Sequence, residues 1–225
     1  MDSMNKGFSL FEVILVVAII ILIVISVPLT VNLRKQIGRG QDTKRKSELT
    51  ALSHILEDYY NDKGHFPTPA EICYNPVSGQ TSCNICGNQE TPDAMKAYTT
   101  KLPCDPQYPA KNYLYQIDDE AAPSVFRIYT KFSTDDDPSI AEKDCQYGCG
   151  PYPNFFYSWG VTSTNTGLET RLVKCEDAAH LYTLVNNICN ICGNYDQCKT
   201  NFGSTTVFYY NPDGFPADCS VPCKP

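Results

Sequence analysis

The chain begins with a helical pattern that is apolar on all sides. From Phe8 to Val27 almost every residue is apolar, and Glu12 is the only one that carries a formal charge. These twenty residues span about 30 Å at the helical rise of about 1.5 Å per residue, which is the hydrocarbon thickness of a bilayer. The run therefore predicts a membrane-spanning helix.

A second helical pattern, from Asp42 to Asn61, is amphipathic. Its apolar residues recur at steps of three and four, which marks one face for packing against a core (Leu49, Leu52, Ile55, Leu56 and Tyr59). Gly64 suits a C-terminal cap, and Pro67 prevents any continuation.

The two patterns are joined by a segment of low helix propensity. Pro28 removes a helical hydrogen bond, and Gly38 and Gly40 each cost about 1 kcal/mol relative to alanine in a helix interior. We therefore expect one interrupted helix over residues 8–63, with residues 28–40 as its weak part.

Strand patterns follow the helix. Residues Asn112–Ile117 and Val125–Phe132 alternate between apolar and polar positions, with Asp118-Asp119-Glu120 in the link between them, and Phe155–Val161 adds a third candidate strand. The predicted fold class is α+β. A long helix, membrane-spanning in its first half and amphipathic in its second, packs on an antiparallel β-sheet head.

The last sixty residues predict a separate, cysteine-rich subdomain. Within Cys175–Cys192 the apolar spacing predicts a short helical stretch (Ala178, Leu181, Leu184, Val185 and Ile188). A lobe of this size buries little apolar area, so we expect covalent cross-links to stabilise it.

Twelve cysteines occur in the chain, and all of them follow the helical segment. They are Cys73, Cys83, Cys86, Cys104, Cys145, Cys149, Cys175, Cys189, Cys192, Cys198, Cys219 and Cys223. An even number beyond an export-type N-terminus predicts disulfides formed outside the cytoplasm. Their pairing stays open, although near neighbours such as Cys145 with Cys149, or Cys219 with Cys223, are sterically able to pair.

Two copies of the sequence Cys-Asn-Ile-Cys-Gly-Asn keep two alternatives open. Cys83, Cys86, Cys189 and Cys192 could hold a zinc ion as four thiolates, because paired Cys-x2-Cys turns are typical of structural zinc sites. A redox-active Cys-x2-Cys is the other alternative, although the βαβ frame of a thioredoxin is not apparent.

The charge distribution bears on orientation and on partners. Six cations follow the apolar run (Arg34, Lys35, Arg39, Lys44, Arg45 and Lys46) against Lys6 alone before it, and the positive-inside tendency would place the following chain in the cytoplasm. The cysteines favour the opposite side. Residues 65–225 contain eighteen acidic and ten basic residues, which disfavours nucleic acid as a partner.

The sequence contains one candidate cation-binding site and no recognisable catalytic motif. Asp135, Asp136 and Asp137 follow a predicted strand and offer oxygen ligands for calcium, and a solvated acidic loop is the alternative. The three histidines, His54, His65 and His180, lie in no recognisable catalytic setting. We therefore expect that the protein is not an enzyme.

The N-terminal residues resemble a known family. Gly7 before Phe8, with Glu12 at the fifth position after that junction, resembles the prepilin leader of type IV pilins and type II secretion pseudopilins. The segment Leu102-Pro103-Cys104-Asp105-Pro106 before the strands resembles the major pseudopilin more weakly. Major pseudopilins also carry a calcium-binding loop after their strands, but their fuller Gly- and Asp-rich loop is not matched here.

The resemblance implies processing and assembly. A prepilin peptidase would cut between Gly7 and Phe8, the new amine on Phe8 would be methylated, and Glu12 would pair with that amine in a neighbouring subunit. The physical chemistry agrees, because a carboxylate inside an apolar helix is costly and requires a partner. A plain membrane anchor with an incidental glutamate is the alternative.

The expected organisation follows from these observations. Residues 1–7 are a leader peptide, 8–64 the transmembrane and stalk helix, 65–165 a pilin-like β head and 166–225 a cysteine-rich extension. The resemblance implies a structural subunit of a type IV pilus-like extracellular filament. The alternatives are the major pseudopilin of a type II secretion system, in the periplasm, and a minor tip pilin with an adhesive head. Its partners would be further copies of itself, the peptidase, the inner membrane and its assembly machinery.

Overall fold

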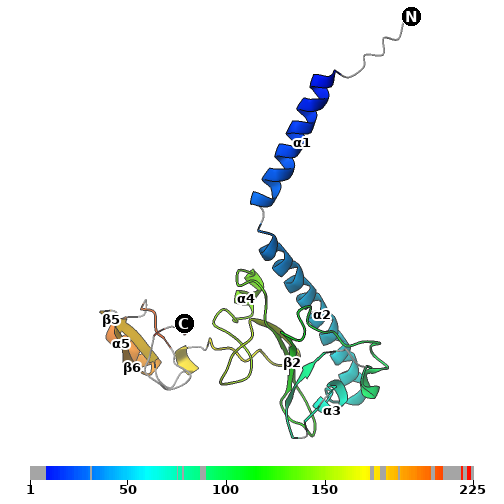
Figure 1. The fold of residues 1–225 in the computed structure, drawn as a ribbon. Coiled ribbons are helices and arrows are strands. Elements are labelled where there is room, and N and C mark those ends of the chain that lie inside the picture. Colours follow the sequence, from blue (N-terminus) through cyan, green and yellow to red (C-terminus); the bar gives the residue numbers. More distant parts are fainter. Residues whose placement is uncertain are drawn as a thin grey trace, which may run out of the picture.

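A computed structural model describes residues 9–30, 32–74, 76–77, 79–86, 90–172, 175–177, 181–186, 188–203, 206–209, 219 and 222–223. Helix α1 (Leu10–Thr30) projects away from the rest of the molecule and is followed by α2 (Leu33–Lys63), which enters the head (Figure 1). Among these residues, no helix combines the length and the hydropathy that crossing a bilayer requires.

The predicted interruption of the long helix is confirmed, and it is narrower than expected. The side chain of Asn32 accepts a hydrogen bond from the Lys35 amide at 3.2 Å and so caps the start of α2. Pro28 lies within α1, while Gly38 and Gly40 both lie within α2. The predicted C-terminal cap is also confirmed, since Gly64 has a left-handed φ of 79°.

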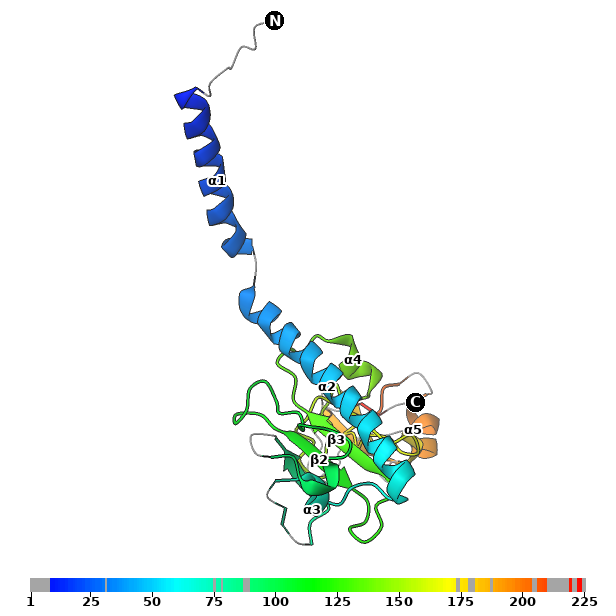
Figure 2. The ribbon, with the colours of Figure 1, turned by 90° about the vertical axis from the view of Figure 1, so that its right-hand side faces the viewer.

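The head is built on one antiparallel sheet in the order β1-β2-β3-β4. Its strands are β1 (Ser82–Ile85), β2 (Tyr113–Ile117), β3 (Phe126–Thr130) and β4 (Trp159–Thr162). The second and third candidate strands of the sequence are thus confirmed as β3 and, starting four residues later than predicted, β4. Helix α2 lies across the sheet (Figure 2).

The face of α2 that the sequence predicts for packing forms one side of the core. Leu49, Leu52, Leu56 and Tyr59 are buried there, and Ile55 is partly buried against them. From the sheet, alternate residues of β2 and β3 supply the other side (Tyr113, Tyr115, Ile117, Phe126 and Ile128). The apolar residues that recur every 3.6 residues on the helix and every second residue on the strands are therefore buried in the same core.

Short elements cover the remaining surface of the head. They are α3 (Pro69–Ile72), the 3-10 turn η1 (Asp93–Met95) and α4 (Pro138–Glu142). At the start of α3 the Glu71 carboxylate accepts hydrogen bonds from the Thr68 amide at 2.8 Å and from the Thr68 hydroxyl at 2.9 Å.

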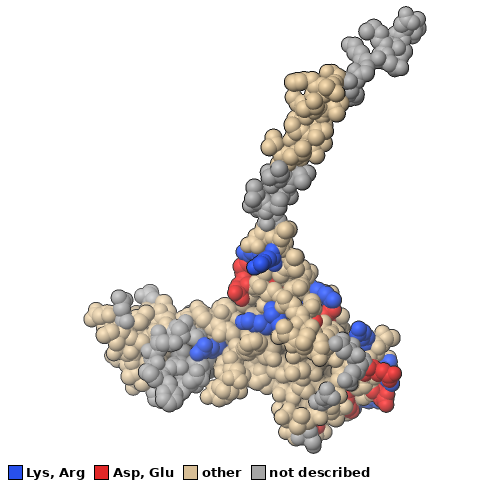
Figure 3. All heavy atoms as spheres, in the orientation of Figure 1, with Lys and Arg blue, Asp and Glu red and all other residues tan. Residues whose placement is uncertain are grey.

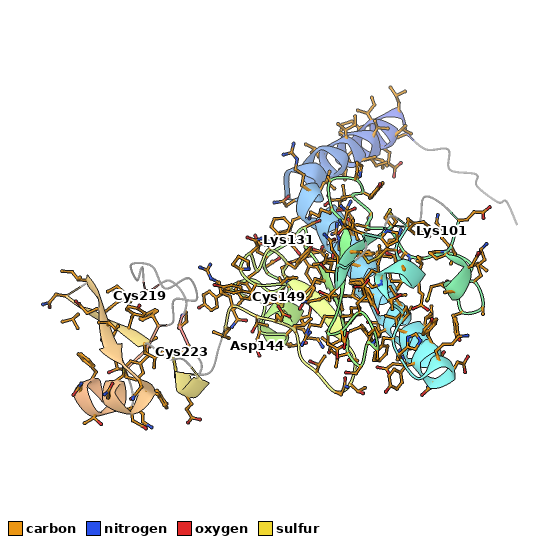
Figure 4. The ribbon with its side chains drawn as sticks, turned by 90° about the horizontal axis from the view of Figure 1, so that it is seen from below. Lys101, Lys131, Asp144, Cys149, Cys219 and Cys223 are labelled. Carbon is orange, nitrogen blue, oxygen red and sulfur yellow. A yellow bond between two sulfur atoms is a disulfide. The ribbon has the colours of Figure 1, made fainter. Side chains whose placement is uncertain are left out.

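The C-terminal lobe has a second, smaller core. It contains η2 (Cys175–Asp177), a hairpin of β5 (Leu181–Val185) and β6 (Ile188–Gly193), and α5 (Tyr195–Phe202). The buried residues of the lobe gather in their own cluster (Cys175, Leu181, Cys198, Phe208 and Cys223). Figure 4 shows the labelled Cys219 and Cys223 in this lobe, beside the head that carries Cys149 and Asp144.

The helical stretch predicted within Cys175–Cys192 is wrong. Leu181 and Thr183 are buried with Tyr182 half-exposed between them, which is the alternation of a strand. Asn186 then turns the chain with a φ of 52°, a conformation that asparagine tolerates better than most residues.

All twelve cysteines form disulfides, as the sequence predicts. Three lie in the head (Cys73–Cys83, Cys86–Cys104 and Cys145–Cys149) and three in the lobe (Cys175–Cys223, Cys189–Cys219 and Cys192–Cys198). The pairing of Cys145 with Cys149 is thus found, and that of Cys219 with Cys223 is not. No bridge joins the head to the lobe.

The zinc arrangement does not form. Cys83, Cys86, Cys189 and Cys192 belong to four different disulfides, and a disulfide sulfur has no thiolate to offer a metal. The redox alternative is not found either, because neither Cys-x2-Cys pair is bonded to itself.

Candidate assembly site

The residues predicted for processing and assembly lie at the N-terminal end. Gly7 and Phe8 fall outside the described residues. Glu12 lies in the first turn of α1, where its amide donates a hydrogen bond to the Ser9 carbonyl at 3.0 Å. Its side chain is exposed, and within the described part of a single subunit it forms no ion pair.

The surface of α1 around Glu12 is apolar and exposed on every side. Leu10 and Phe11 are 80% and 72% exposed, and the same holds to a lesser degree for the following side chains (Val13, Ile14, Leu15, Val16, Val17, Ile19, Ile20, Ile21 and Leu22). Isolated apolar residues on a surface are ordinary, but a continuous exposed run from Leu10 to Leu22 marks an interaction surface.

Helix α2 is fixed to the head by a buried ion triad. The Arg45 guanidinium donates two parallel hydrogen bonds to the Asp105 carboxylate, Nε to Oδ2 and Nη2 to Oδ1, both at 2.7 Å. Its Nη1 donates to Asp42 Oδ1 at 2.7 Å. All three side chains have no exposed surface. Each carboxylate is hydrogen-bonded to the guanidinium, and the negative charge in excess is stabilised by neutral donors, the amides of Ser133 and Thr134 and the Thr134 hydroxyl, which bind Asp42.

Asp42 also holds the loop that follows β3. Its Oδ1 accepts from the Ser133 amide at 2.7 Å, and its Oδ2 accepts from the Thr134 amide at 3.0 Å and from the Thr134 hydroxyl at 2.7 Å. One side chain of α2 therefore satisfies two backbone amides of a loop ninety residues away.

Gly38 allows α2 to approach the same loop closely. A Cβ at this position would lie 3.1 Å from Thr134 Cγ2 and 3.4 Å from Ser133 Cβ, whereas a Cβ at Gly40 would meet nothing within 4 Å. Gly38 is buried and helical. Its role is thus close packing against the head, in place of the helix weakness that the sequence predicts.

A second layer of ion pairs surrounds the triad near the surface. Lys35 Nζ and Arg39 Nη2 lie 2.7 Å and 2.8 Å from Asp136 Oδ2, and Lys46 Nζ lies 2.7 Å from Asp137 Oδ2. The hydrogen bonds from Lys35 and Arg39 lower the pKa of Asp136 to about 2. Figure 3 shows blue and red side chains side by side where α2 meets the head.

The acidic loop predicted as a calcium site takes part in these contacts. Asp136 and Asp137 bind cations of α2, Asp137 also accepts from the Ser139 amide at the start of α4, and Asp135 is exposed. Among the residues that the structure describes, no three acidic, histidine or cysteine side chains are grouped to hold a metal ion.

The sequence contains a signal for the triad that pattern reasoning missed. The packing face of α2 continues N-terminally from Leu49 at the same steps of three and four, and these positions are Arg45, Asp42 and Gly38. Charged residues on an apolar stripe normally end a packing face. Here they extend it, because Asp105 completes the triad from a distant loop.

Part of the chain is similar to a known secretion protein. It is 29% identical over 103 residues to the protein named type II secretion system core protein G of Escherichia coli (strain K12). The match covers 45% of this chain and 66% of that protein. No family model and no solved structure matches the chain. The similarity to a type II secretion core protein supports, at the level of the family, the relation to pilins and pseudopilins that the N-terminal residues resemble.

Proposed function

We propose that this protein is a structural, non-enzymatic subunit of a pilus-like filament that assembles through α1. The observation that carries the proposal is helix α1, which projects from a folded head and whose side chains from Leu10 to Leu22 are exposed and, apart from Glu12, apolar. Such a surface is unfavourable in water, and packing α1 helices of many copies side by side removes it from solvent.

Glu12 sets the register of that packing. Cleavage between Gly7 and Phe8 by a prepilin peptidase leaves a terminal amine on Phe8, and the Glu12 carboxylate of a neighbouring subunit binds it. Inside a bundle of apolar helices an unpaired carboxylate is strongly disfavoured, so only an arrangement that pairs it is stable. Before assembly, α1 resides in the inner membrane.

The triad and the ion pairs around it give the stalk a fixed direction relative to the head. A subunit whose head rocked freely on its stalk would not repeat regularly. Arg45 joins Asp42 on α2 to Asp105 on the head, and Gly38 lets the two surfaces touch. The head is therefore presented at one angle in every copy.

Two observations favour different kinds of filament. The similarity to type II secretion system core protein G favours a pseudopilin in the periplasm. The lobe with its three disulfides, which adds a braced surface to the head, favours an extracellular pilus. We propose an extracellular pilus first, with a pseudopilin and an adhesive tip subunit as the alternatives. Nucleic acid is not an expected partner.

A substitution at Glu12 tests the proposal. In cells that produce Glu12→Leu, we expect the processed subunit in the membrane fraction and no filaments by electron microscopy, because the apolar helix is retained and the pairing carboxylate is lost. Wild-type filaments should yield Phe8 as the first residue on terminal sequencing. Normal filaments from Glu12→Leu, or a mature chain that starts elsewhere, would contradict the proposal.

A further inference from the structure

A cavity of about 470 Å³ opens on the head at the edge of the sheet formed by β1. Six uncharged polar or aromatic side chains line it (Tyr74, Gln80, Ser82, Asn84, Tyr108 and Asn112). This volume lies in the range of sites for small molecules. We call it the edge cavity.

Neutral lining distinguishes the edge cavity from other hollows of the head. The hollow along α2 includes Lys44, Glu48 and Lys101, and the one beside α4 includes Lys131 and three aspartates. None of the described residues that line the edge cavity is charged. The chain has a net charge of −7, so a cavity without charged lining is a local exception, and it favours an uncharged ligand.

The wall of the edge cavity is cross-linked. Cys83 and Cys86 line it, and their disulfides tie β1 to Cys73 on one side and to Cys104 on the other. Two disulfides on and next to one short strand keep the cavity preformed in the absence of a ligand. A site that is formed in advance loses little conformational entropy on binding.

Two polar atoms in the wall of the edge cavity lack a hydrogen-bond partner. Asn112 Oδ1 and the Tyr74 hydroxyl are buried, and neither forms a hydrogen bond with any described residue. Leaving a buried polar atom unpaired is costly, so a small movement of either side chain towards the cavity, where it meets a ligand hydroxyl, would be favourable. The amides of Gln80 and Asn84 are exposed, and each offers both donors and an acceptor.

An aromatic ring completes the lining. Tyr108 is 43% exposed although it borders the cavity, so much of its ring is open to a ligand. The face of an aromatic ring is negative and attracts polarised C–H groups. An aromatic face beside several amides matches a molecule with apolar C–H faces and a rim of hydroxyls.

We propose that the edge cavity binds a neutral carbohydrate of one or two sugar units. Asn112, Asn84 and Gln80 hydrogen-bond its hydroxyls, and Tyr108 packs on a C–H face of the ring. The inference is independent of how the filament forms, because the cavity lies within one head.

The test uses the full chain in a detergent without a sugar head group, since a glycoside detergent would occupy the site. The probes are galactose, N-acetylglucosamine and lactose, with sialyllactose as the charged counterpart. Saturation-transfer NMR and titration should show saturable binding of at least one neutral probe, and weaker binding of sialyllactose than of lactose. Glu12→Leu should bind as the wild type does, which separates this inference from the proposed function.

Variants locate the binding. Tyr108→Ala and Asn84→Ala change exposed side chains, and each should weaken binding by about tenfold. Tyr108→Phe keeps the ring and should retain the affinity. The matched control is Tyr152→Ala, which removes a tyrosine that is 64% exposed elsewhere on the head. No saturable binding of a neutral probe, equal or tighter binding of sialyllactose, or full affinity in Tyr108→Ala and Asn84→Ala would overturn the proposal.

Discussion

At the scale of single residues, Arg45 determines whether the stalk and the head form one unit. Its side chain is fully buried between Asp42 and Asp105, which are 63 positions apart in the chain. A guanidinium is able to serve both because its five donors point in fixed directions, whereas a lysine offers a single charged group. Burial acts to lower the pKa of Arg45, but its hydrogen bonds to the Asp105 and Asp42 carboxylates and their negative charges outweigh burial and raise the pKa.

Replacing Arg45 should therefore destabilise the head strongly. Arg45→Met leaves two buried carboxylates without a counter-charge, and we expect a loss of about 3–5 kcal/mol in the free energy of unfolding. Chemical denaturation followed by tryptophan fluorescence measures it, since Trp159 lies in the core.

The control for this change is Lys44→Ala. Lys44 pairs with Glu48 at 3.6 Å on the exposed surface of the same helix, and such a pair contributes only about 0.3–0.5 kcal/mol. A loss below about 1 kcal/mol in Arg45→Met would show that the triad does not hold α2 to the head.

Gly38 and Gly40 offer a second comparison at this scale. Both are helical, but only Gly38 faces the loop at Ser133 and Thr134. Gly40→Leu should leave the protein as stable as before or raise its stability by up to about 1 kcal/mol, because leucine is a better helix former. Gly38→Leu should lower it by about 1–3 kcal/mol, because the side chain has no room. Thermal unfolding of the two variants side by side measures both, and equal midpoints would contradict the packing role of Gly38.

At the scale of elements, the N-terminal turns of α2 are held by charge more than by apolar packing. Lys35 and Arg39 both reach Asp136, and the first buried apolar residue of the helix is Leu49. These contacts account for four of the six cations that follow the apolar run. Lys35, Arg39, Arg45 and Lys46 bind carboxylates of the head, so their positions reflect folding of the head and need no cytoplasmic location.

This arrangement predicts that acid loosens the start of α2. Lys35 and Arg39 hold the pKa of Asp136 at about 2, below the ordinary value of 3.8, so the folded state favours the ionised form. The stabilisation is fully present above pH 3.8 and is lost as the pH falls through about 2. The protection of the amides of residues 33–40, measured as their hydrogen exchange rate relative to the intrinsic rate at each pH, should decrease over that interval.

Asp136→Asn serves as the comparison, because it removes the charge at every pH. In this variant the amides of residues 33–40 should be less protected than in the wild type at pH 5, and their protection should change less between pH 4 and pH 2. Identical exchange in both proteins at pH 5 would show that the pair does not hold the helix.

At the scale of the whole molecule, the head and the lobe are stabilised in different ways. The head has a large apolar core between α2 and the sheet, whereas the buried apolar cluster of the lobe contains five of its described residues, three of which are cysteines. A lobe with so little apolar burial depends on its cross-links. The Cys175–Cys223 bridge closes the longest loop, with a separation of 48 residues.

Removing that bridge should unfold the lobe and leave the head folded. By the loop-entropy model, a loop of this length contributes roughly 4 kcal/mol, against roughly 2 kcal/mol for the four-residue separation of Cys145–Cys149. In the double variant Cys175→Ser/Cys223→Ser we expect hydrogen exchange protection to disappear from β5 and β6 and to persist in β2 and β3. Cys145→Ser/Cys149→Ser is the matched control and should keep protection in the lobe. Loss of the head sheet in the first variant would contradict separate stabilisation.

The similarity to a secretion core protein covers less than half of this chain, and no bridge joins the head to the lobe.

The helices and strands predicted from the sequence depend on the local pattern of apolar and polar residues. Strands with clear alternation, such as Val125–Phe132, were placed well. The hairpin from Leu181 was mistaken for a helix, because its apolar residues happen to recur at helical steps and only the burial of Leu181 and Thr183 decides between the two.

The sequence by itself determined the long helix, its interruption, the apolar surface of α1, the core face of α2 and the presence of disulfides. These features depend on residues near one another in the chain, where period and propensity act directly. The tertiary structure alone decided that Arg45 is buried between Asp42 and Asp105, that Asp136 and Asp137 hold cations of α2, and which cysteines pair. Each of these depends on groups that only folding brings within about 3 Å of one another. The interaction energy of a charged group and the ability of a cysteine to form a disulfide are set by these spatial neighbours and not by position in the sequence.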